Sequence, residues 1–172
     1  VMNTNLPSKT AIIQYWQEHA RDLADITGYV PDWDEPACWT CGYPVETWDN
    51  NSLERCHIIP KSLGGANSPS NIVLMCKVCH DTAPDTSDAE AFAQWAKSQS
   101  YIRRWLRDFI HALEDLGMPV DDAAQDRYAT AMQQPAFELL REHAGYHWFR
   151  ASRPGPGIKP ATIASLLQRY LA

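Results

Sequence analysis

Two pairs of cysteines carry the strongest chemical signal in the sequence. Each pair encloses two residues, in C-W-T-C from Cys38 to Cys41 and in C-K-V-C from Cys76 to Cys79. Each pair can offer two thiolates to one tetrahedral ion, and four sulfur ligands favour zinc, with iron as the alternative. The pattern therefore predicts a structural zinc ion on these four cysteines. Two unrelated buried cysteine pairs are the less favoured interpretation.

The segment between the two pairs must itself contain folded structure. Residues 42–75 are longer than the about 15–20 residues that separate the knuckles of a simple zinc ribbon. Two short apolar runs in this region, Cys56 to Ile59 and Ile72 to Met75, have the length and flanks of strands. They predict an antiparallel pair joined by a long loop. Residues 54–80 read E-R-C-H-I-I-P-K-S-L-G-G-A-N-S-P-S-N-I-V-L-M-C-K-V-C-H.

This ordered pattern resembles the HNH endonuclease superfamily, the ββα-metal nucleases. In that family a histidine ends the first strand, an asparagine precedes the second, and a histidine or asparagine lies on the following helix. The matching positions here are His57, Asn71 and His80. Together with the I-I-P turn, the G-G loop and both cysteine pairs, the resemblance runs from Cys38 to about Asp81. It implies hydrolysis of DNA to 5′-phosphate and 3′-hydroxyl ends.

The resemblance also implies a role for each polar position. Attack on an anionic phosphodiester needs a base that deprotonates water and a cation that stabilises the developing charge. His57 is expected to be the base, because an imidazole with a pKa of about 6.5 is largely neutral at pH 7. His80 is expected to bind a catalytic divalent metal such as Mg²⁺, Mn²⁺ or Ni²⁺. The Asn71 amide is expected to bond backbone across the G-G loop and hold His57 in place.

One position departs from the family pattern. Many members have Asp or His immediately before the base, as a ligand of the catalytic metal, and this sequence has Cys56. A thiol suits softer ions such as Zn²⁺, Co²⁺ or Ni²⁺ better than Mg²⁺. Glu54, two residues earlier, lies on the same face of a strand and is an alternative ligand. Cys56 as a buried hydrophobe, with the ion held by His80, substrate and water, is a third reading. We favour Glu54 or water over Cys56.

The elements that position these residues are mostly helices. Apolar periodicity predicts a helix over residues 8–27 and one from an S-x-x-E capping box at Ser87 to Gly117. It also predicts one helix or a pair over 121–144, interrupted at Pro135, and a last helix over 160–171. The predicted fold class is α+β, mostly helical, with a small zinc-stapled ββα-metal core surrounded by N- and C-terminal helices. We expect an N-terminal helix in 1–30, the nuclease core in 31–86 and a helical C-terminal region with a basic tail in 87–172.

Charge and hydropathy limit the functional classes. With 15 Lys and Arg against 21 Asp and Glu, the net charge is -6, which excludes a polycationic nucleic-acid coat protein but not a local basic groove. No apolar run approaches the about 20 residues of a membrane span. Five cysteines in such a chain favour metal binding in a reducing, cytoplasmic setting. Candidate nucleic-acid contacts, for which a solvated or packing role is the alternative, are Arg55, Lys61, Arg103, Arg104, Arg107, Arg150 and Arg153.

The function predicted from these features is a metal-dependent endonuclease acting on double-stranded DNA. Family analogy favours restriction or phage defence as its setting, and cutting both strands of a palindrome would favour a homodimer. The alternative is a non-catalytic zinc module that binds nucleic acid or a protein partner. The absence of Asp or His at position 56 motivates this alternative.

Overall fold

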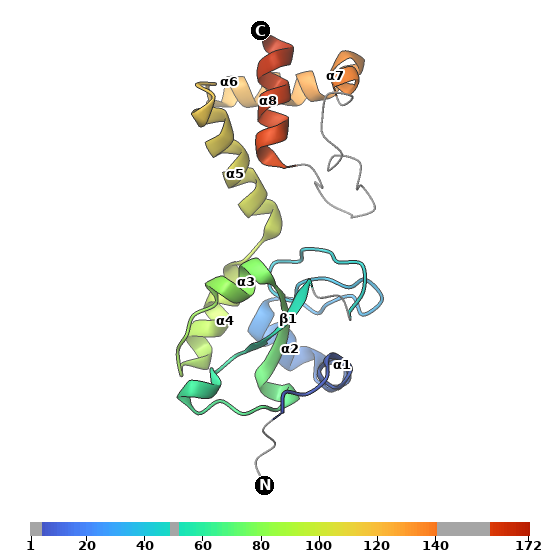
Figure 1. Cartoon of the computed structure of the whole chain (residues 1–172), viewed down its shortest axis with the longest axis vertical. Coiled ribbons are helices and arrows are strands. Elements are labelled where there is room, and N and C mark those ends of the chain that lie inside the picture. Colours follow the sequence, from blue (N-terminus) through green and yellow to red (C-terminus); the bar gives the residue numbers. More distant parts are fainter. Residues whose placement is uncertain (1–4, 49–51, 141–158) are drawn as a thin grey trace. The chain divides into compact units, whose positions relative to one another are not determined.

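The computed structural model describes residues 5–48, 52–140 and 159–172. These residues form a mostly helical fold with one two-stranded antiparallel sheet (Figure 1), which confirms the predicted fold class. The chain divides into two compact units, Val1–Tyr101 (unit 1) and Ile102–Ala172 (unit 2). No helix in the described residues is long and apolar enough to cross a bilayer.

The sheet and the helix after it form a ββα unit within unit 1. Strand β1 (Leu53–His57) pairs with β2 (Ile72–Cys76), with Glu54 opposite Met75 and His57 opposite Ile72. All five residues of β2 are buried, as its unbroken apolar sequence requires. Helix α3 (Lys77–Thr82) follows directly and packs on both strands. The first strand ends at His57, two residues before the predicted end, because the chain then turns at the I-I-P sequence.

Two short 3₁₀ helices, η1 (Lys61–Leu63) and η2 (Pro69–Asn71), lie in the loop between the strands. Gly64 ends η1 with a φ of 93°, a left-handed conformation that favours glycine. The Ile58 amide donates to the Asn71 carbonyl at 2.8 Å and extends the pairing of the two strands past His57. The loop is therefore anchored at both ends.

The predicted helix over residues 8–27 is two helices, α1 (Lys9–Glu18) and α2 (Ala20–Thr27). The prediction of one continuous helix was wrong, because the helix is interrupted at His19. The ring nitrogen Nδ1 of His19 lies 2.7 Å from the Tyr15 carbonyl oxygen. A side chain that bonds a carbonyl of the preceding turn bends a helix. Helix α1 packs against β2 and η2, and the Trp16 indole of α1 donates to the Ile72 carbonyl at 2.8 Å.

The long helix predicted to begin at Ser87 is also divided, into α4 (Ala89–Ser98) and α5 (Tyr101–Asp115). Its cap is Asp88 rather than Ser87, because the Asp88 carboxylate accepts from the Glu90 and Ala91 amides at 2.9 and 3.3 Å. Helix α4 ends where Gln99 turns to an extended backbone. The Tyr101 amide then donates to the Cys41 carbonyl at 3.0 Å, so a tertiary contact competes with the helix.

Unit 2 has its own hydrophobic core. Besides most of α5, it contains α6 (Asp122–Met132), α7 (Pro135–Leu140) and α8 (Pro160–Leu171). The predicted interruption at Pro135 is confirmed, since Pro135 is the first residue of α7, and residues 141–144 of that prediction lie outside the described residues. The core of unit 2 is made of Phe109, Leu113, Ala124, Tyr128, Ala131, Phe137, Ile163, Ala164, Leu166 and Leu167.

Candidate functional site

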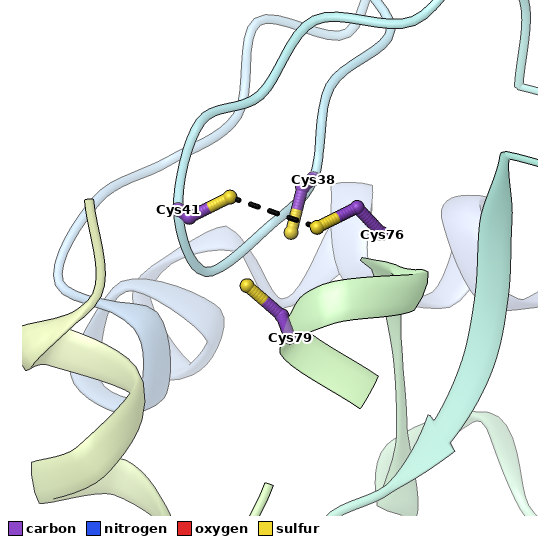
Figure 2. A group of neighbouring side chains, drawn as sticks. All are labelled: Cys38, Cys41, Cys76 and Cys79. Atoms are coloured by element: carbon purple, nitrogen blue, oxygen red, sulfur yellow. Dashed lines mark hydrogen bonds between the residues drawn. The ribbon is translucent and has the colours of Figure 1, made fainter. Parts of the chain in front are cut away.

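The four paired cysteines meet in one buried cluster. Figure 2 shows Cys38 and Cys41 on one loop and Cys76 and Cys79 at the start of α3, with their sulfur atoms turned toward one another. All four sulfur atoms lie within 4.8 Å of each other, and those of Cys41 and Cys76 are 3.8 Å apart. Four sulfurs at about 2.3 Å from one tetrahedral zinc would be separated by about 3.8 Å. The cluster therefore supports the predicted structural zinc site.

The four thiols of this cluster differ in their pKa values and so in how readily they ionise. Burial opposes ionisation of Cys38, but hydrogen bonds from Cys41, Cys76 and Cys79 hold the pKa of Cys38 well below its usual range. Hydrogen bonds of Cys41 with Cys38, Cys76 and Cys79 raise the pKa of Cys41, and the bond with Cys38 is the largest cause. Hydrogen bonds within the cluster thus favour the thiolate form at some of its cysteines and the thiol form at others. A dication removes this difference, because coordinated thiols are deprotonated.

Residues outside the cluster fix the first cysteine knuckle, the loop from Cys38 to Cys41. The hydroxyl of the half-buried Tyr29 donates to the Cys38 carbonyl at 2.6 Å, and loss of solvent around it raises the pKa of Tyr29. The Cys38 amide donates to the Tyr43 carbonyl at 2.8 Å, and the Trp39 amide donates to Leu74 of β2 at 2.9 Å. These bonds hold the knuckle against the sheet. Tyr29 carries no sequence signal for this role, since it lies nine residues before Cys38.

His57 lies half-buried at the end of β1, and its ring has a side-chain partner. The His57 Nε2 atom is 2.9 Å from Asn67 Oδ1. Asn71 bonds backbone across the G-G loop: its Oδ1 accepts from the Ile59 amide at 3.0 Å, and its Nδ2 donates to the Ile59 and Ala66 carbonyls at 2.9 and 3.0 Å. The contact of Asn67 with His57 could not be read from the sequence, where Asn67 is one of several small polar loop residues.

The third polar position, His80, faces an acidic group. Its Nδ1 atom is 3.2 Å from Glu54 Oε2 and 3.9 Å from Asp81 Oδ1, and the three residues offer ligand atoms within 4.8 Å of one another. Two ligands at about 2.1 Å from one ion would lie about 3.0–3.4 Å apart, so the separation of Glu54 and His80 suits a shared divalent cation. Asp81 went unrecognised in the sequence because adjacent residues usually point to different sides of a helix.

Cys56 lies apart from this acidic group. Its side chain is 5% exposed, and its thiol points to the His57 carbonyl at 3.6 Å. Burial, and then the charges of Asp85, Cys38, Cys79 and Glu54, raise the pKa of Cys56 to about 12. It is therefore a neutral thiol near neutral pH. It belongs to neither group of potential metal ligands among the described residues.

The candidate nucleic-acid contacts fall in different parts of the chain. Arg55 is exposed, donates to the Pro7 carbonyl at 3.1 Å, and lines a surface cavity of about 380 Å³ with Leu6, Lys9, Leu53 and Glu54. Lys61 is exposed at the start of η1. Arg103, Arg104 and Arg107 lie on α5 in unit 2, and Arg107 pairs with Asp108 at 3.0 Å. Arg150 and Arg153 lie outside the described residues.

The described residues thus combine a ββα unit, a cluster of four cysteines suited to a metal ion, and the polar residues His57, Asn71 and His80 in that order. Residues 38–96 match the family model described as HNH endonuclease. The match begins at the first zinc cysteine and ends within α4. No curated protein and no solved structure matches the chain.

Proposed function

We propose that the protein is a metal-dependent endonuclease that hydrolyses DNA phosphodiester bonds, with His57 as the general base. The observation that carries the proposal is the position of His57, half-buried at the end of β1 with one ring nitrogen bonded to Asn67. His57 lies within the segment that matches the HNH endonuclease family model. A neutral imidazole there takes the proton of the attacking water. Asn71 keeps the loop behind the ring rigid through its bonds to Ile59 and Ala66.

Glu54 and His80, with Asp81, would hold the catalytic metal. A carboxylate and an imidazole accept Mg²⁺, Mn²⁺ or Ni²⁺, and the 3.2 Å between Glu54 and His80 fits ligands of one ion. Such a cation stabilises negative charge on the phosphate and the leaving oxygen when it is bound. Cys56 has no part in this site, because its thiol is neutral and buried. The structural zinc and the catalytic metal would occupy separate sites.

Double-stranded DNA is the proposed substrate, cut to 5′-phosphate and 3′-hydroxyl ends as the family resemblance implies. Arg55 and Lys61 are the first candidates for phosphate contacts, since both are exposed, with Arg55 on the strand that carries His57 and Lys61 in the loop that follows it. Lys9 adds a second cation to the cavity beside Arg55 and Glu54. A cytoplasmic role in restriction or phage defence suits five free cysteines and the family analogy. A homodimer would serve a palindromic target.

A non-catalytic zinc module is the second candidate, and Cys56 is the observation that favours it. The position where many relatives have an Asp or His ligand is a buried thiol here. In such a module the Glu54–His80 contact would be only an ion pair, and the zinc cluster would support a binding surface for nucleic acid or a protein.

A plasmid assay separates the two candidates. Zinc-loaded protein is incubated with supercoiled DNA and either no added ion or Mg²⁺, Mn²⁺ or Ni²⁺, and nicked product is followed on a gel. The nuclease proposal expects nicking with at least one added ion and none without an added ion. Absence of nicking with every ion, in protein that still binds DNA, would instead favour the non-catalytic module.

A further inference from the structure

We infer that Asn67 is a positioning residue that selects the tautomer of His57 and so decides which ring nitrogen receives the proton. The inference rests on the proposed function, because it concerns the general base of that same site. It specifies that His57 Nδ1 accepts the proton of the attacking water, and that the Asn67 side chain keeps this nitrogen unprotonated.

The atoms that meet in this contact set the direction of the hydrogen bond. The Asn67 Oδ1 atom is an acceptor without a proton, and it lies 2.9 Å from His57 Nε2. The bond therefore requires a proton on Nε2. A neutral imidazole carries a single ring proton, so the lone pair lies on Nδ1. Nδ1 is then the nitrogen that can deprotonate a water molecule.

The loop holds Asn67 where this bond can form. The preceding carbonyl, of Ala66, accepts from Asn71 Nδ2 at 3.0 Å, and the Gly65 amide donates to the Pro60 carbonyl at 3.0 Å. A Cβ atom on Gly65 would lie 1.7 Å from the Ile59 carbonyl oxygen, so the backbone passes too closely for any other residue. Asn71, the last residue before β2, thus fixes the segment that carries Asn67.

Loss of the Asn67 oxygen should free the His57 ring without removing the base. The ring could then rotate or carry its proton on Nδ1, and a nitrogen that bears a proton cannot accept another. A smaller fraction of molecules would be competent, which lowers the rate of the chemical step rather than DNA affinity. We expect about a tenfold loss, the size that one hydrogen bond of ordinary strength supports.

Nuclear magnetic resonance of the zinc-loaded full chain reports the tautomer directly. Long-range ¹H–¹⁵N spectra near pH 8, above the usual imidazole pKa of about 6.5, distinguish a protonated from an unprotonated ring nitrogen. The His57 signals are assigned by their loss in His57→Ala. Wild type and Asn67→Asp, which keeps an acceptor oxygen, should show a protonated Nε2 with a slowly exchanging N–H proton. In Asn67→Ala both nitrogen shifts should move toward each other and the N–H proton should disappear.

Ser70→Ala is the matched control, because Ser70 lies in the same loop and its hydroxyl bonds only the Ser68 hydroxyl among the described contacts. It should leave the His57 signals and the single-turnover cleavage rate unchanged. Asn67→Ala should cleave about tenfold more slowly at unchanged DNA affinity. A protonated Nδ1 in wild type, or His57 shifts unchanged in Asn67→Ala, would overturn the inference.

The two proposals fail in different ways. If wild type does not cleave DNA, the nuclease proposal fails, while the spectra still decide whether Asn67 sets the tautomer. If His57→Ala is inactive but Asn67→Ala has the wild-type rate and spectrum, the inference about Asn67 fails alone.

Discussion

Glu54 and Cys56 lie two residues apart on β1, yet only Glu54 offers a charged, accessible ligand atom to a cation. Glu54 presents a half-exposed carboxylate 3.2 Å from His80. The Cys56 thiol is buried, and burial raises its pKa to about 12, so ionising it near neutral pH is unfavourable. A hard ion such as Mg²⁺ therefore has a suitable ligand in Glu54 and an unsuitable one in Cys56.

Substitution of Glu54 should accordingly change the metal requirement, and substitution of Cys56 should not. We expect Glu54→Gln to raise the Mg²⁺ concentration for half-maximal cleavage by more than about tenfold, because a charged ligand is lost. Cys56→Ala is the control and should stay within about twofold of wild type. Metal titrations of the cleavage rate provide the measurement. A shift in Cys56→Ala larger than that in Glu54→Gln would point to a thiol ligand.

Functional residues that follow a fixed spacing can be predicted from the sequence, whereas side-chain contacts that depend on the folded loop cannot. The four zinc cysteines were found from spacing alone, because two C-x-x-C pairs have few other uses in a short chain. The partners Asn67 and Asp81 were not found. Asn67 meets His57 only because the loop folds back through bonds made by Asn71 and Gly65. Asp81 joins Glu54 and His80 only through the packing of α3 on β1.

The loop between β1 and β2 works as one rigid element. Its tightest point is Gly65, where the backbone leaves no room for a side chain beside the Ile59 carbonyl. Gly64, the next residue toward β1, has open space and a φ of 93°. Gly64 is therefore favoured by its left-handed backbone conformation, and Gly65 is required by the close approach of the Ile59 carbonyl.

This difference predicts unequal effects of substitution in the G-G sequence. Gly65→Ala should displace the loop, lower stability by about 1–3 kcal/mol and slow cleavage, since Asn67 and Asn71 both depend on this turn. Gly64→Asn should be nearly neutral, because asparagine adopts the left-handed conformation readily. Thermal melting and cleavage rates test both variants. Equal losses in the two would mean that close approach at Gly65 is unimportant.

The helices were predicted well in their apolar pattern and less well in their ends. Periodicity in α4 and α5 continues through residues 99–100, yet the helix stops there. The Gln99 and Ser98 side chains both donate to the Trp95 carbonyl, and the Tyr101 amide donates to Cys41. The last contact comes from the distant zinc knuckle, so no local sequence pattern could have shown it.

The whole molecule combines two units that are stabilised in different ways. Unit 1 contains the four-cysteine cluster and the proposed nuclease site, whereas unit 2 has a separate apolar core of helices α5 to α8. Zinc in finger-like peptides contributes about 10–16 kcal/mol of binding energy that is coupled to folding. The net charge of -6 offers no general attraction to DNA, so binding must depend on local cations near the site.

Removal of zinc should therefore affect the two units unequally. In Cys41→Ser, or after chelation, hydrogen exchange should become fast in β1, β2 and α3 and remain slow in α6 and α8. Cys56→Ala, which leaves the cluster intact, should keep both its zinc and its protection. Mass spectrometry measures zinc content and exchange together. Full protection of β2 in zinc-free protein would contradict a structural role for the metal.

The role of His57 as the general base is tested most directly by the single-turnover cleavage rate of a labelled DNA duplex. This rate is compared between wild type and His57→Ala at equal zinc content. A general base contributes about 10²–10⁴-fold, so we expect His57→Ala to be slower by at least about 100-fold with unchanged DNA binding. The wild-type product should carry 5′-phosphate ends. Equal rates in the two proteins would contradict the proposal that His57 performs the chemistry.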